Sequence, residues 1–510
     1  MPDVKHSTTA IRSAVVVGAL LLAVAGCGGA AKKPAASPTS QAPTQSTAAS
    51  GASAIASQPM ALNKGTARVD LLAVDRSAAN TVTLRWRVTN ISSQQVNLEG
   101  AMERESAKFK PDQPADGVSL VDATANKRYF PLYDTAGACL CPLHEATKVD
   151  LDPGKSAEFY AVLPAPAASL QQIAVMIPLT PLFQAVPIGS SPRPFSGTEI
   201  DPAKASLKAP DIVSLISTAE GTVESTDDSG ASRSVRLSAD VLFAINKSNL
   251  TPAAQSVLKQ VAQQIDASTG ATVTVDGYTD NTGNDAINNP LSVARARAVE
   301  SQVKLLVTRQ GVSYQAAGHG SGDPVADNGS EEGRRKNRRV TVTFARPAVQ
   351  ASSGSGSAAP AAPAPAWTGG KLPVAATATP LANNVKGLKL EINSVHRDAT
   401  GLTTMTWTLT NTASTKFGVG FTFVDRGQEF NYDGLNVPGA RLVDQAGKLT
   451  YSPLRDEGKE CICTNLNKGK GNLDPGESVT YFDSYELPPG AASVDVTFPF
   501  FAPAQHVQVQ

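Results

Sequence analysis

Histidine is scarce in this chain, and the common catalytic motifs are missing. The 510 residues include five histidines, and no two of these stand at the spacing of paired metal ligands. The chain has no Gly-x-Ser-x-Gly, no phosphate-binding glycine-rich loop and no His-Glu-x-x-His. His319, in Gly318-His-Gly-Ser-Gly322, is interpreted as a loop residue. We therefore expect a binding or structural protein that is not an enzyme and has no cofactor and no metal.

Net charge and long apolar runs are also missing. Lys plus Arg and Asp plus Glu each total 45, so the formal net charge is zero, and no basic block supports attraction to nucleic acid. The apolar run 14–25 follows Lys5 and Arg12; it is too short to span a bilayer but suits a signal peptide. It ends at Gly26-Cys27, and small residues directly before a cysteine resemble a lipoprotein box.

These features predict a lipoprotein signal peptide at 1–26, which is cleaved before Cys27. The Cys27 sulfur then receives diacylglyceryl and its acyl chains, such as palmitate, and anchors an exported protein to a membrane of the cell envelope. That membrane is the plasma membrane, at its extracytoplasmic face, or the outer membrane. The alternative is an ordinary signal peptide followed by a chance cysteine.

Aromatic residues make up only 5% of the chain, and two stretches have almost no large apolar side chains. Residues 27–59 are mainly Ala, Pro, Ser, Thr and Gln, which predicts a disordered tether. Residues 348–371 run from Ser-Gly repeats into alternating Ala and Pro, which predicts a linker. Residues 196–233 are polar and mixed, and we expect a connector there.

Cysteine is also scarce, with five residues in the chain. Apart from Cys27 they form two Cys-x-Cys pairs, Cys139 with Cys141 and Cys461 with Cys463. Two cysteines that stand two residues apart on an extended strand have Cα atoms about 7 Å apart, which is too far for a disulfide. A bond within each pair, which an exported chain favours, therefore requires a tight turn. Cross-pairing between the two pairs and a four-thiolate zinc site are the alternatives.

An internal duplication is the first positive feature. Leu84-Arg-Trp86-Arg-Val-Thr-Asn90 matches Met405-Thr-Trp407-Thr-Leu-Thr-Asn411, and Leu-Asp-Pro-Gly recurs at 151–154 and 473–476. Two domains follow, at 60–195 and 372–505. Their short alternating strands, each copy with a tryptophan that we expect to be buried, predict immunoglobulin-like β-sandwiches.

The segment 234–347 between the two copies has a different pattern. The order strand, helix, strand, helix, strand, strand predicts an α+β domain with its helices on one face of a mixed sheet. Residues 241–243 are expected to end the first strand, and Thr251-Pro252 opens the first helix. A strand follows at 271–275, and Asn289-Pro290 is expected to open the second helix, with Arg295 in its second turn.

Polar residues across this segment suit a zwitterionic amino-acid ligand. Asp280 lies just past a strand in Gly277-Tyr-Thr-Asp-Asn-Thr-Gly283, Arg295 lies on the next helix, and Asn337-Arg-Arg339 precedes the last strand. A carboxylate can bind the ligand's ammonium group, and a guanidinium fork can bind its carboxylate with two parallel hydrogen bonds.

These ordered motifs resemble those of the OmpA C-terminal domain family, which includes the domains of OmpA, Pal-type lipoproteins and flagellar motor proteins. The resemblance implies non-covalent binding of peptidoglycan through the meso-diaminopimelate of its stem peptide. Asp280 would then bind the ammonium and Arg295 the carboxylate. Four further positions that match the family's pocket are Asn246, Thr282, Asn288 and Arg338. The segment Phe243-Ala-Ile-Asn246 departs from the family because it lacks an acidic residue.

The sequence therefore predicts a lipid-anchored envelope protein that tethers a membrane to peptidoglycan. The alternative is an envelope interaction or assembly protein. Its sandwich domains would recruit an unknown envelope protein, and the central domain would only position it on the wall.

Overall fold

The computed structural model describes residues 53–347, 367 and 370–510, apart from short internal gaps. The gaps are 63, 78–79, 105–114, 142–148, 196, 198, 420–422, 424–431, 433–438, 447 and 466–470. The predicted signal peptide, Cys27, most of the predicted tether and most of the 348–371 linker lie outside the described residues. Within the described part of the chain, no helix has both the length and the apolar character needed to cross a bilayer.

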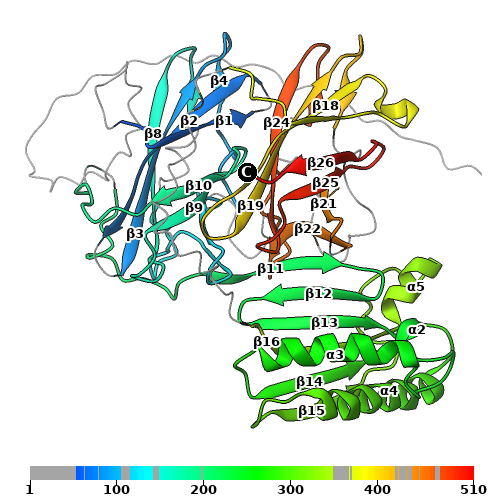
Figure 1. Cartoon of the computed structure of the whole chain (residues 1–510). Helices are drawn as coiled ribbons and strands as arrows, with labels where there is room; N and C mark the ends of the chain where they lie inside the picture. The colour runs from blue at the N-terminus through cyan, green and yellow to red at the C-terminus, as the bar shows by residue number, and fades with distance from the viewer. Residues whose placement is uncertain are drawn as a thin grey trace, which may run out of the picture. The chain divides into compact units, whose positions relative to one another are not determined.

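Each copy of the repeat has one separate four-stranded antiparallel sheet and contributes four further antiparallel strands to a 14-stranded sheet (Figure 1). The first copy has the orders β1-β2-β3-β8 and β10-β9-β5-β6. Its strands are β1 (Ala56–Ala61), β2 (Thr66–Ser77), β3 (Thr81–Asn90), β5 (Ser119–Asp122), β6 (Lys127–Tyr129), β8 (Ser156–Pro164), β9 (Gln172–Met176) and β10 (Phe183–Pro187). A short extra ladder joins β4 (Val96–Asn97) to β7 (Asp150–Leu151).

The second copy has the same arrangement, strand for strand, with the orders β17-β18-β19-β24 and β26-β25-β21-β22. Its strands are β17 (Ala376–Ala378), β18 (Leu388–Arg397), β19 (Leu402–Asn411), β21 (Arg441–Asp444), β22 (Leu449–Asp456), β24 (Ser478–Glu486), β25 (Ser493–Thr497) and β26 (Ala504–Gln508). The extra ladder recurs as β20 (Phe417–Gly418) with β23 (Asn472–Leu473), and one 3₁₀ turn, η1, spans Asn383–Val385. The two copies recognised in the sequence therefore have the same strand topology. The immunoglobulin-like classification of these sandwiches stays a prediction.

The tryptophans are the centres of the two sandwich cores. Trp86 and Trp407 are both fully buried, as predicted from the alternation in β3 and β19. Trp86 stacks on Phe159 with 5.8 Å between ring centroids, and Trp407 lies 4.6 Å from the ring of Tyr481. Because strand side chains alternate between faces, one residue in two from each sheet joins this shared core.

The predicted domain boundaries require correction at three places. Strand β1 begins at Ala56, inside the range expected to be tether, and β26 continues to Gln508, past the expected end at 505. The expected connector, 196–233, contains two strands, β11 (Ile212–Glu220) and β12 (Glu224–Ser229), and the first two residues of β13 (Ser232–Ser238). The composition of β12 is polar, and its side chains are mostly only partly buried, whereas β11 begins with an apolar strand signal at 212–216.

Strand β11 joins sheets that belong to different parts of the chain. Its residues 212–214 pair with β6 of the first copy, and 215–220 pair with β22 of the second. Its second half also pairs with β12, which leads through β13 into the central domain. A segment expected only to connect domains therefore supplies backbone hydrogen bonds to all three.

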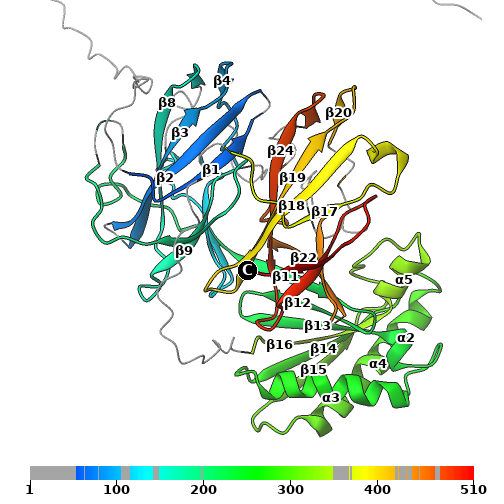
Figure 2. The same ribbon diagram turned by 45° about the horizontal axis from the view of Figure 1, so that its top comes forward.

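The central domain is a mixed sheet with the order β12-β13-β16-β14-β15, and β14 and β15 are its one parallel pair among the described strands. Its helices α3 and α4 contact each other and share one apolar core with the sheet (Figure 2). The elements are α2 (Ala239–Leu242), α3 (Pro252–Asp266), β14 (Thr272–Gly277), α4 (Asp285–Leu306), β15 (Ser313–Gly318), α5 (Glu331–Asn337) and β16 (Arg339–Ala345). The α+β architecture was expected, but α2 and α5 were not.

Two predicted boundaries in this domain are wrong. The first strand ends at Ser238, and the residues read as its end form α2, which buries Ala239 and Leu242 three positions apart. Helix α4 begins at Asp285, where the Asn284 side chain accepts a hydrogen bond from the N–H of Ile287 at 3.2 Å. Pro290 therefore lies inside the helix. Its missing N–H leaves the carbonyl four residues earlier without a helical partner, which is tolerable because this turn is exposed to solvent.

Each Cys-x-Cys pair is joined by a disulfide in the structure. The Cα atoms are 5.1 Å apart in the Cys139–Cys141 pair and 5.2 Å apart in the Cys461–Cys463 pair. These distances are shorter than a fully extended strand allows, so the backbone bends between the two cysteines. The disulfide connectivity of the protein remains a prediction.

Candidate ligand-binding site

Asp280 is a buried carboxylate held by three hydrogen bonds in the loop after β14. Its residue is 5% exposed. Oδ1 accepts from the backbone N–H of Thr282 at 2.9 Å and from the Thr282 hydroxyl, while Oδ2 accepts from Arg338 Nη1 at 2.8 Å. Burial by itself raises the pKa of Asp280, but the hydrogen bonds from Thr282 and Arg338 outweigh it and keep the pKa below its usual value. Asp280 is therefore ionised at neutral pH.

Arg295 is a buried cation with two unoccupied donor groups. It is the eleventh residue of α4, about three turns in and not in the second turn as expected, and it is 5% exposed. Its Nε donates to the carbonyl of Lys247 at 3.1 Å, and its guanidinium carbon lies 5.3 Å from the centroid of the Phe243 ring. Within the described part of the chain, its two terminal nitrogens donate to no acceptor.

The charge of Arg295 persists despite burial. Burial lowers the pKa of Arg295, and the nearby charge of Asp240 opposes this shift. Arginine nevertheless remains protonated at neutral pH. A cation without an ion-pair partner in a low-dielectric setting favours an anion that reaches its free terminal nitrogens.

Arg338 links the site to the helices around it. Besides Asp280, it donates to both oxygens of Asp240, at 3.0 and 2.8 Å, and to Glu331 at 3.0 Å. Its hydrogen bond to Asp240 is the main reason why its pKa is raised, with burial acting in the opposite sense. Glu331 is also paired with Arg334, at 2.9 Å, so three guanidinium groups balance the three carboxylates, which suits a ligand that carries one carboxylate and one ammonium group.

The other predicted residues hold the loops of the site. Asn288 donates from Nδ2 to the carbonyl of Thr282 at 3.0 Å, and so fixes the Asp280 loop to α4. Asn246 is exposed and has a positive φ of 55°, in the turn directly before Lys247. Direct contacts therefore connect Asp280, Thr282, Asn288 and Arg338, whereas Asn246 reaches Arg295 only through the carbonyl of its neighbour.

Sequence reasoning missed Asp240, Glu331 and the Lys247 carbonyl. Asp240 stands three residues before Phe243 and supplies the acidic group that the Phe243–Asn246 segment lacks. Asp240 was missed because α2 was expected to be the end of a strand. A carboxylate in that strand would not have been assigned to the candidate site. Glu331 carried no sequence signal, because it is one of several charges on α5.

Close backbone packing aligns the two halves of the site. A methyl group on Gly277, at the end of β14, would lie 2.2 Å from the carbonyl oxygen of Ser292 on α4. A methyl group on Gly318, at the end of β15, would lie 2.3 Å from the nitrogen of Val293. These glycines let α4 approach the sheet, and the approach sets the position of Arg295 relative to Asp280.

The mixed sheet carries an acid in the loop after β14, with arginines on α4 and directly after α5, an arrangement that resembles an OmpA-like domain. Comparison with known proteins agrees, because residues 242–338 match the OmpA family. The chain belongs to the OmpA family through this segment.

Individual relatives match over the same part of the chain. The peptidoglycan-binding protein ArfA of Mycobacterium tuberculosis (strain ATCC 25618 / H37Rv) is 42% identical over 104 residues, which cover 20% of this chain and 31% of ArfA. The chain thus spans about a third of the length of that relative. YfiB of Escherichia coli (strain K12), whose name describes it provisionally as a lipoprotein, is 37% identical over 123 residues, or 24% of this chain and 75% of YfiB. The solved structure of the cell wall anchor of the T6SS from Pseudomonas aeruginosa is 30% identical, with a TM-score of 0.22, and covers 24% of this chain and 87% of that one.

Proposed function

We propose that this protein binds peptidoglycan non-covalently by holding the diaminopimelate of the stem peptide between Asp280 and Arg295. The observation that carries the proposal is Arg295, a buried guanidinium whose terminal nitrogens have no acceptor among the described residues. It lies beside a cluster of carboxylates, Asp280, Asp240 and Glu331. The side chain of diaminopimelate ends in a carboxylate and an ammonium on one carbon, which is the complementary pair.

The two ends of the ligand have separate partners in this proposal. The ligand carboxylate receives two parallel hydrogen bonds from Arg295, whose Nε is already held by Lys247 and therefore fixes the plane of the fork. The ligand ammonium donates to Asp280, which shares its Oδ2 with Arg338. Thr282 and Asn288 hold the loop, so little ordering remains to be done when the ligand binds.

We further propose that lipid on Cys27 attaches the protein to a membrane of the cell envelope. The relatives support an envelope location, since one is named a peptidoglycan-binding protein and another a cell wall anchor. With a lipid at one end and wall contact in the central domain, the chain tethers membrane to wall. No residue set in the sequence suits catalysis, and the proposed role is structural.

Sedimentation with purified cell walls tests the wall-binding proposal. The soluble chain from residue 28 onward is preferable to a fragment starting near 230, because β12 belongs to the sheet of the central domain. It should sediment with walls that contain diaminopimelate and stay in solution with walls that have lysine at the same stem position. Lysine lacks the distal carboxylate that Arg295 is proposed to bind, so equal sedimentation with both walls would refute the site.

One observation favours the alternative function, recruitment of an envelope protein by the repeats. Leu381 and Phe500 in the second copy are 70% and 48% exposed, and the N–H of Leu381 donates to the carbonyl of Phe500 at 2.8 Å. Under this alternative, the Leu381→Ser and Phe500→Ser double variant loses a partner that crosslinks to the native chain in cells, while its wall sedimentation is unchanged. Unchanged crosslinking would exclude this surface.

A further inference from the structure

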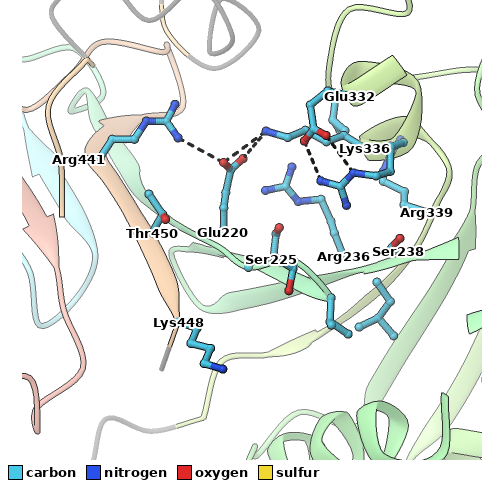
Figure 3. A pocket seen from close by; sticks show the side chains of 16 residues that line it. Glu220, Ser225, Arg236, Ser238, Glu332, Lys336, Arg339, Arg441, Lys448 and Thr450 are labelled. Atoms are coloured by element: carbon cyan, nitrogen blue, oxygen red, sulfur yellow. Dashed lines mark hydrogen bonds and ion pairs between the residues drawn. The ribbon is translucent and has the colours of Figure 1, made fainter. Parts of the chain in front are cut away.

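A second charged cavity lies away from Asp280 and Arg295 (Figure 3). Its volume is about 260 Å³, and it is lined by residues of β11 to β13, by α5 and by β21 and β22 of the second copy. Six of the lining residues are cationic and two are anionic, which leaves four positive charges in excess. The cations are Arg236, Arg335, Lys336, Arg339, Arg441 and Lys448, and the anions are Glu220 and Glu332. We call this hollow the junction cavity.

Only some of these charges are neutralised within the cavity. Glu220 lies between Lys336 Nζ and Arg441 Nη1, each 3.4 Å from a carboxylate oxygen, as Figure 3 shows. Arg335 is paired more closely with Glu332, at 2.7 Å. The two contacts of Glu220 are long, so a stronger anion could displace it from either cation.

Arg339 is a buried cation of this lining and is 5% exposed. Its Nη2 donates to the carbonyl of Asp323 at 2.9 Å, its Nη1 donates to the carbonyl of Asn337 at 3.4 Å, and its guanidinium carbon lies 3.7 Å from the centroid of the Tyr278 ring. No carboxylate among the described residues forms an ion pair with it, and its Nε has no hydrogen-bond acceptor. Burial lowers the pKa of Arg339 to about 10, which reflects the cost of this uncompensated charge. The Nε of Arg236, in the same wall of the cavity, is likewise buried without an acceptor.

Lys448 and four hydroxyl side chains, one of them that of Thr222, complete the polar lining. Lys448 is exposed at the rim and forms no ion pair with another described residue. Ser225, Ser238 and Thr450 lie on the strands that form the walls (Figure 3). Guanidinium groups together with hydroxyls match the several oxygen acceptors of a tetrahedral oxyanion better than the two of a carboxylate.

We propose that the junction cavity binds a small phosphate-bearing anion, of the size of a diphosphate or a sugar phosphate. Arg236 is paired with Asp227 at 3.1 Å, outside the lining, so three positive charges remain in excess, which is more than one carboxylate would balance. The volume corresponds to about nine water molecules at roughly 30 Å³ each, which is room for a diphosphate or a phosphorylated monosaccharide. Such a group occurs free or as part of an envelope polymer, and the cavity recognises the phosphate in either case. The site is separate from the proposed wall site and does not depend on it.

Glu220 gives the site a built-in competitor. When the anion binds, Lys336 and Arg441 exchange the long contacts to Glu220 for contacts to phosphate oxygens. The pKa of Glu220 is held below its usual value by Lys336 and Arg441, which outweigh burial, so Glu220 is ionised and competes at neutral pH. Removing the charge of Glu220 should therefore strengthen anion binding. If the cations served only to hold the domains together, this change would not strengthen it.

Calorimetric titration of the soluble chain from residue 28 tests the proposal. The probes are inorganic pyrophosphate, glucose 1-phosphate as a monoester, and a monoanionic phosphodiester of similar size for the polymer source. The native chain should bind pyrophosphate and at least one ester at low ionic strength, and the order of the two esters identifies the source. Absence of binding to all three probes at millimolar concentration would overturn the proposal.

Variants distinguish a shaped site from general positive charge. Arg441→Gln and Lys448→Gln should each weaken pyrophosphate binding about tenfold, whereas Glu220→Gln should strengthen it. The matched control is Arg297→Gln, since Arg297 is exposed on α4 and lines neither site; its affinity should stay within about twofold of the native value. Lys448→Gln removes no ion pair, so it stays informative if Arg441→Gln disturbs folding. Equal losses in Arg297→Gln and Lys448→Gln would overturn the proposal, and wall sedimentation of the same variants reports separately on the proposed function.

Discussion

At the scale of single residues, three buried charged or titratable groups carry most of the chemistry of this protein. Arg295 and Arg339 are cations that form no ion pair with a carboxylate of the described residues, and Asp483 is a carboxyl group inside the second sandwich. Burying such groups costs stability unless a partner compensates, so their presence calls for a functional or structural reason. For the two arginines the proposed reason is a ligand, and for Asp483 it is a hydrogen bond from Trp407.

The contribution of Arg295 can be measured by substitution. Arg295→Ala leaves the ligand carboxylate without its partner and should cost about 2–5 kcal/mol of binding free energy. Arg295→Lys should lose most of this too, because an ammonium presents no planar fork. Asp280→Ala should cost a similar amount, and the measurement is titration with a diaminopimelate-containing stem peptide.

The control is Arg297, two positions along the same helix and exposed. Arg297→Ala should change the binding free energy by less than about 0.5 kcal/mol, as is usual for a solvated surface charge. A loss equal to that of Arg295→Ala would mean that general positive charge, and not a shaped site, holds the wall.

Asp483 should make stability depend on pH. Its Oδ2 accepts from Trp407 Nε1 at 2.8 Å, and its Oδ1 has no partner among the described residues. Burial raises the pKa of Asp483 to about 8, only partly opposed by the Trp407 hydrogen bond, whereas an unfolded aspartate titrates near about 3.9. Between these values the folded state keeps a proton that the unfolded state has released. Stability therefore falls as pH rises from about 4 to 8, by at most about 1.4 kcal/mol per pH unit.

Thermal unfolding of the native chain and of Asp483→Asn between pH 5 and 8.5 tests this dependence. The variant should have the flatter profile and should be the more stable protein at the upper end. Tyr432 and Tyr485, the neighbouring titratable groups, stay neutral in this range because burial raises both of their pKa values further above the ordinary value. Asp474→Asn, at an exposed carboxylate, should keep the native profile. If Asp483→Asn had the same dependence of stability on pH as the native chain, Asp483 would not be its cause.

At the scale of elements, two contacts decide the geometry: that of α4 with β14, and that of β11 with both repeats. Each depends on one small or apolar residue at a close approach, Gly277 in the first case and Leu215 in the second. Both contacts join segments that are distant in sequence, so their loss affects more than the element that carries the change.

Gly277→Ala should disturb the candidate site without altering any of its polar groups. The added methyl would lie 2.2 Å from the carbonyl oxygen of Ser292. This oxygen belongs to the backbone and not to a flexible side chain, so α4 would have to shift outward. We expect a destabilisation of about 1–3 kcal/mol and weaker wall sedimentation, because α4 carries Arg295. The control is Gly490→Ala, where a methyl has no atom within 4 Å and φ is not positive. Full wall binding by Gly277→Ala would show that the close approach does not position Arg295.

Leu215→Ala should destabilise both repeats at once. Leu215 in β11 is fully buried in a cluster with Val121 of the first copy and with Leu454, Ile462 and Phe482 of the second. Truncating such a side chain costs about 2–5 kcal/mol. The measurement is thermal unfolding combined with limited proteolysis, and cleavage should increase in both copies. Ile212→Ala, at the exposed end of the same strand, is the control, and an equal effect there would contradict a core role for Leu215.

At the scale of the whole molecule, the proposed tether needs an attachment at each end. Wall binding is proposed in the central domain and membrane attachment at Cys27, which lies outside the described residues. Two acyl chains on one diacylglyceryl group suffice for stable anchoring, whereas one chain alone is marginal.

Cys27→Ser tests the membrane end. The variant should leave the membrane fraction, or accumulate as an unprocessed precursor, since its hydroxyl replaces the only proposed lipid acceptor. The measurement is fractionation of cells with immunodetection of the native chain and the variant, after wall digestion so that wall contact does not retain the protein. A processed Cys27→Ser protein that stays in the membrane fraction would show that another element anchors it.

Local pattern in the sequence was enough for a large part of this architecture. The two copies, the burial of Trp86 and Trp407, the opening of α3 at Pro252 and the mixed sheet of the central domain all follow from periodicity, capping and repetition. The ordered residues from Asp280 to Arg338 also identified the family, because recognition motifs keep their order along the chain.

Only the tertiary structure decided which groups meet. The role of Asp240 next to Arg338 depends on α2, where a short helix competes with a strand for the same few apolar residues. The apolar start of β11 at 212–216 is a strand signal, but nothing in it shows that the strand pairs with both repeats. The cavity around Glu220 joins residues more than two hundred positions apart. Periodicity reports how a segment buries its own side chains, whereas pairing between distant segments depends on how their surfaces match, and no local pattern records that.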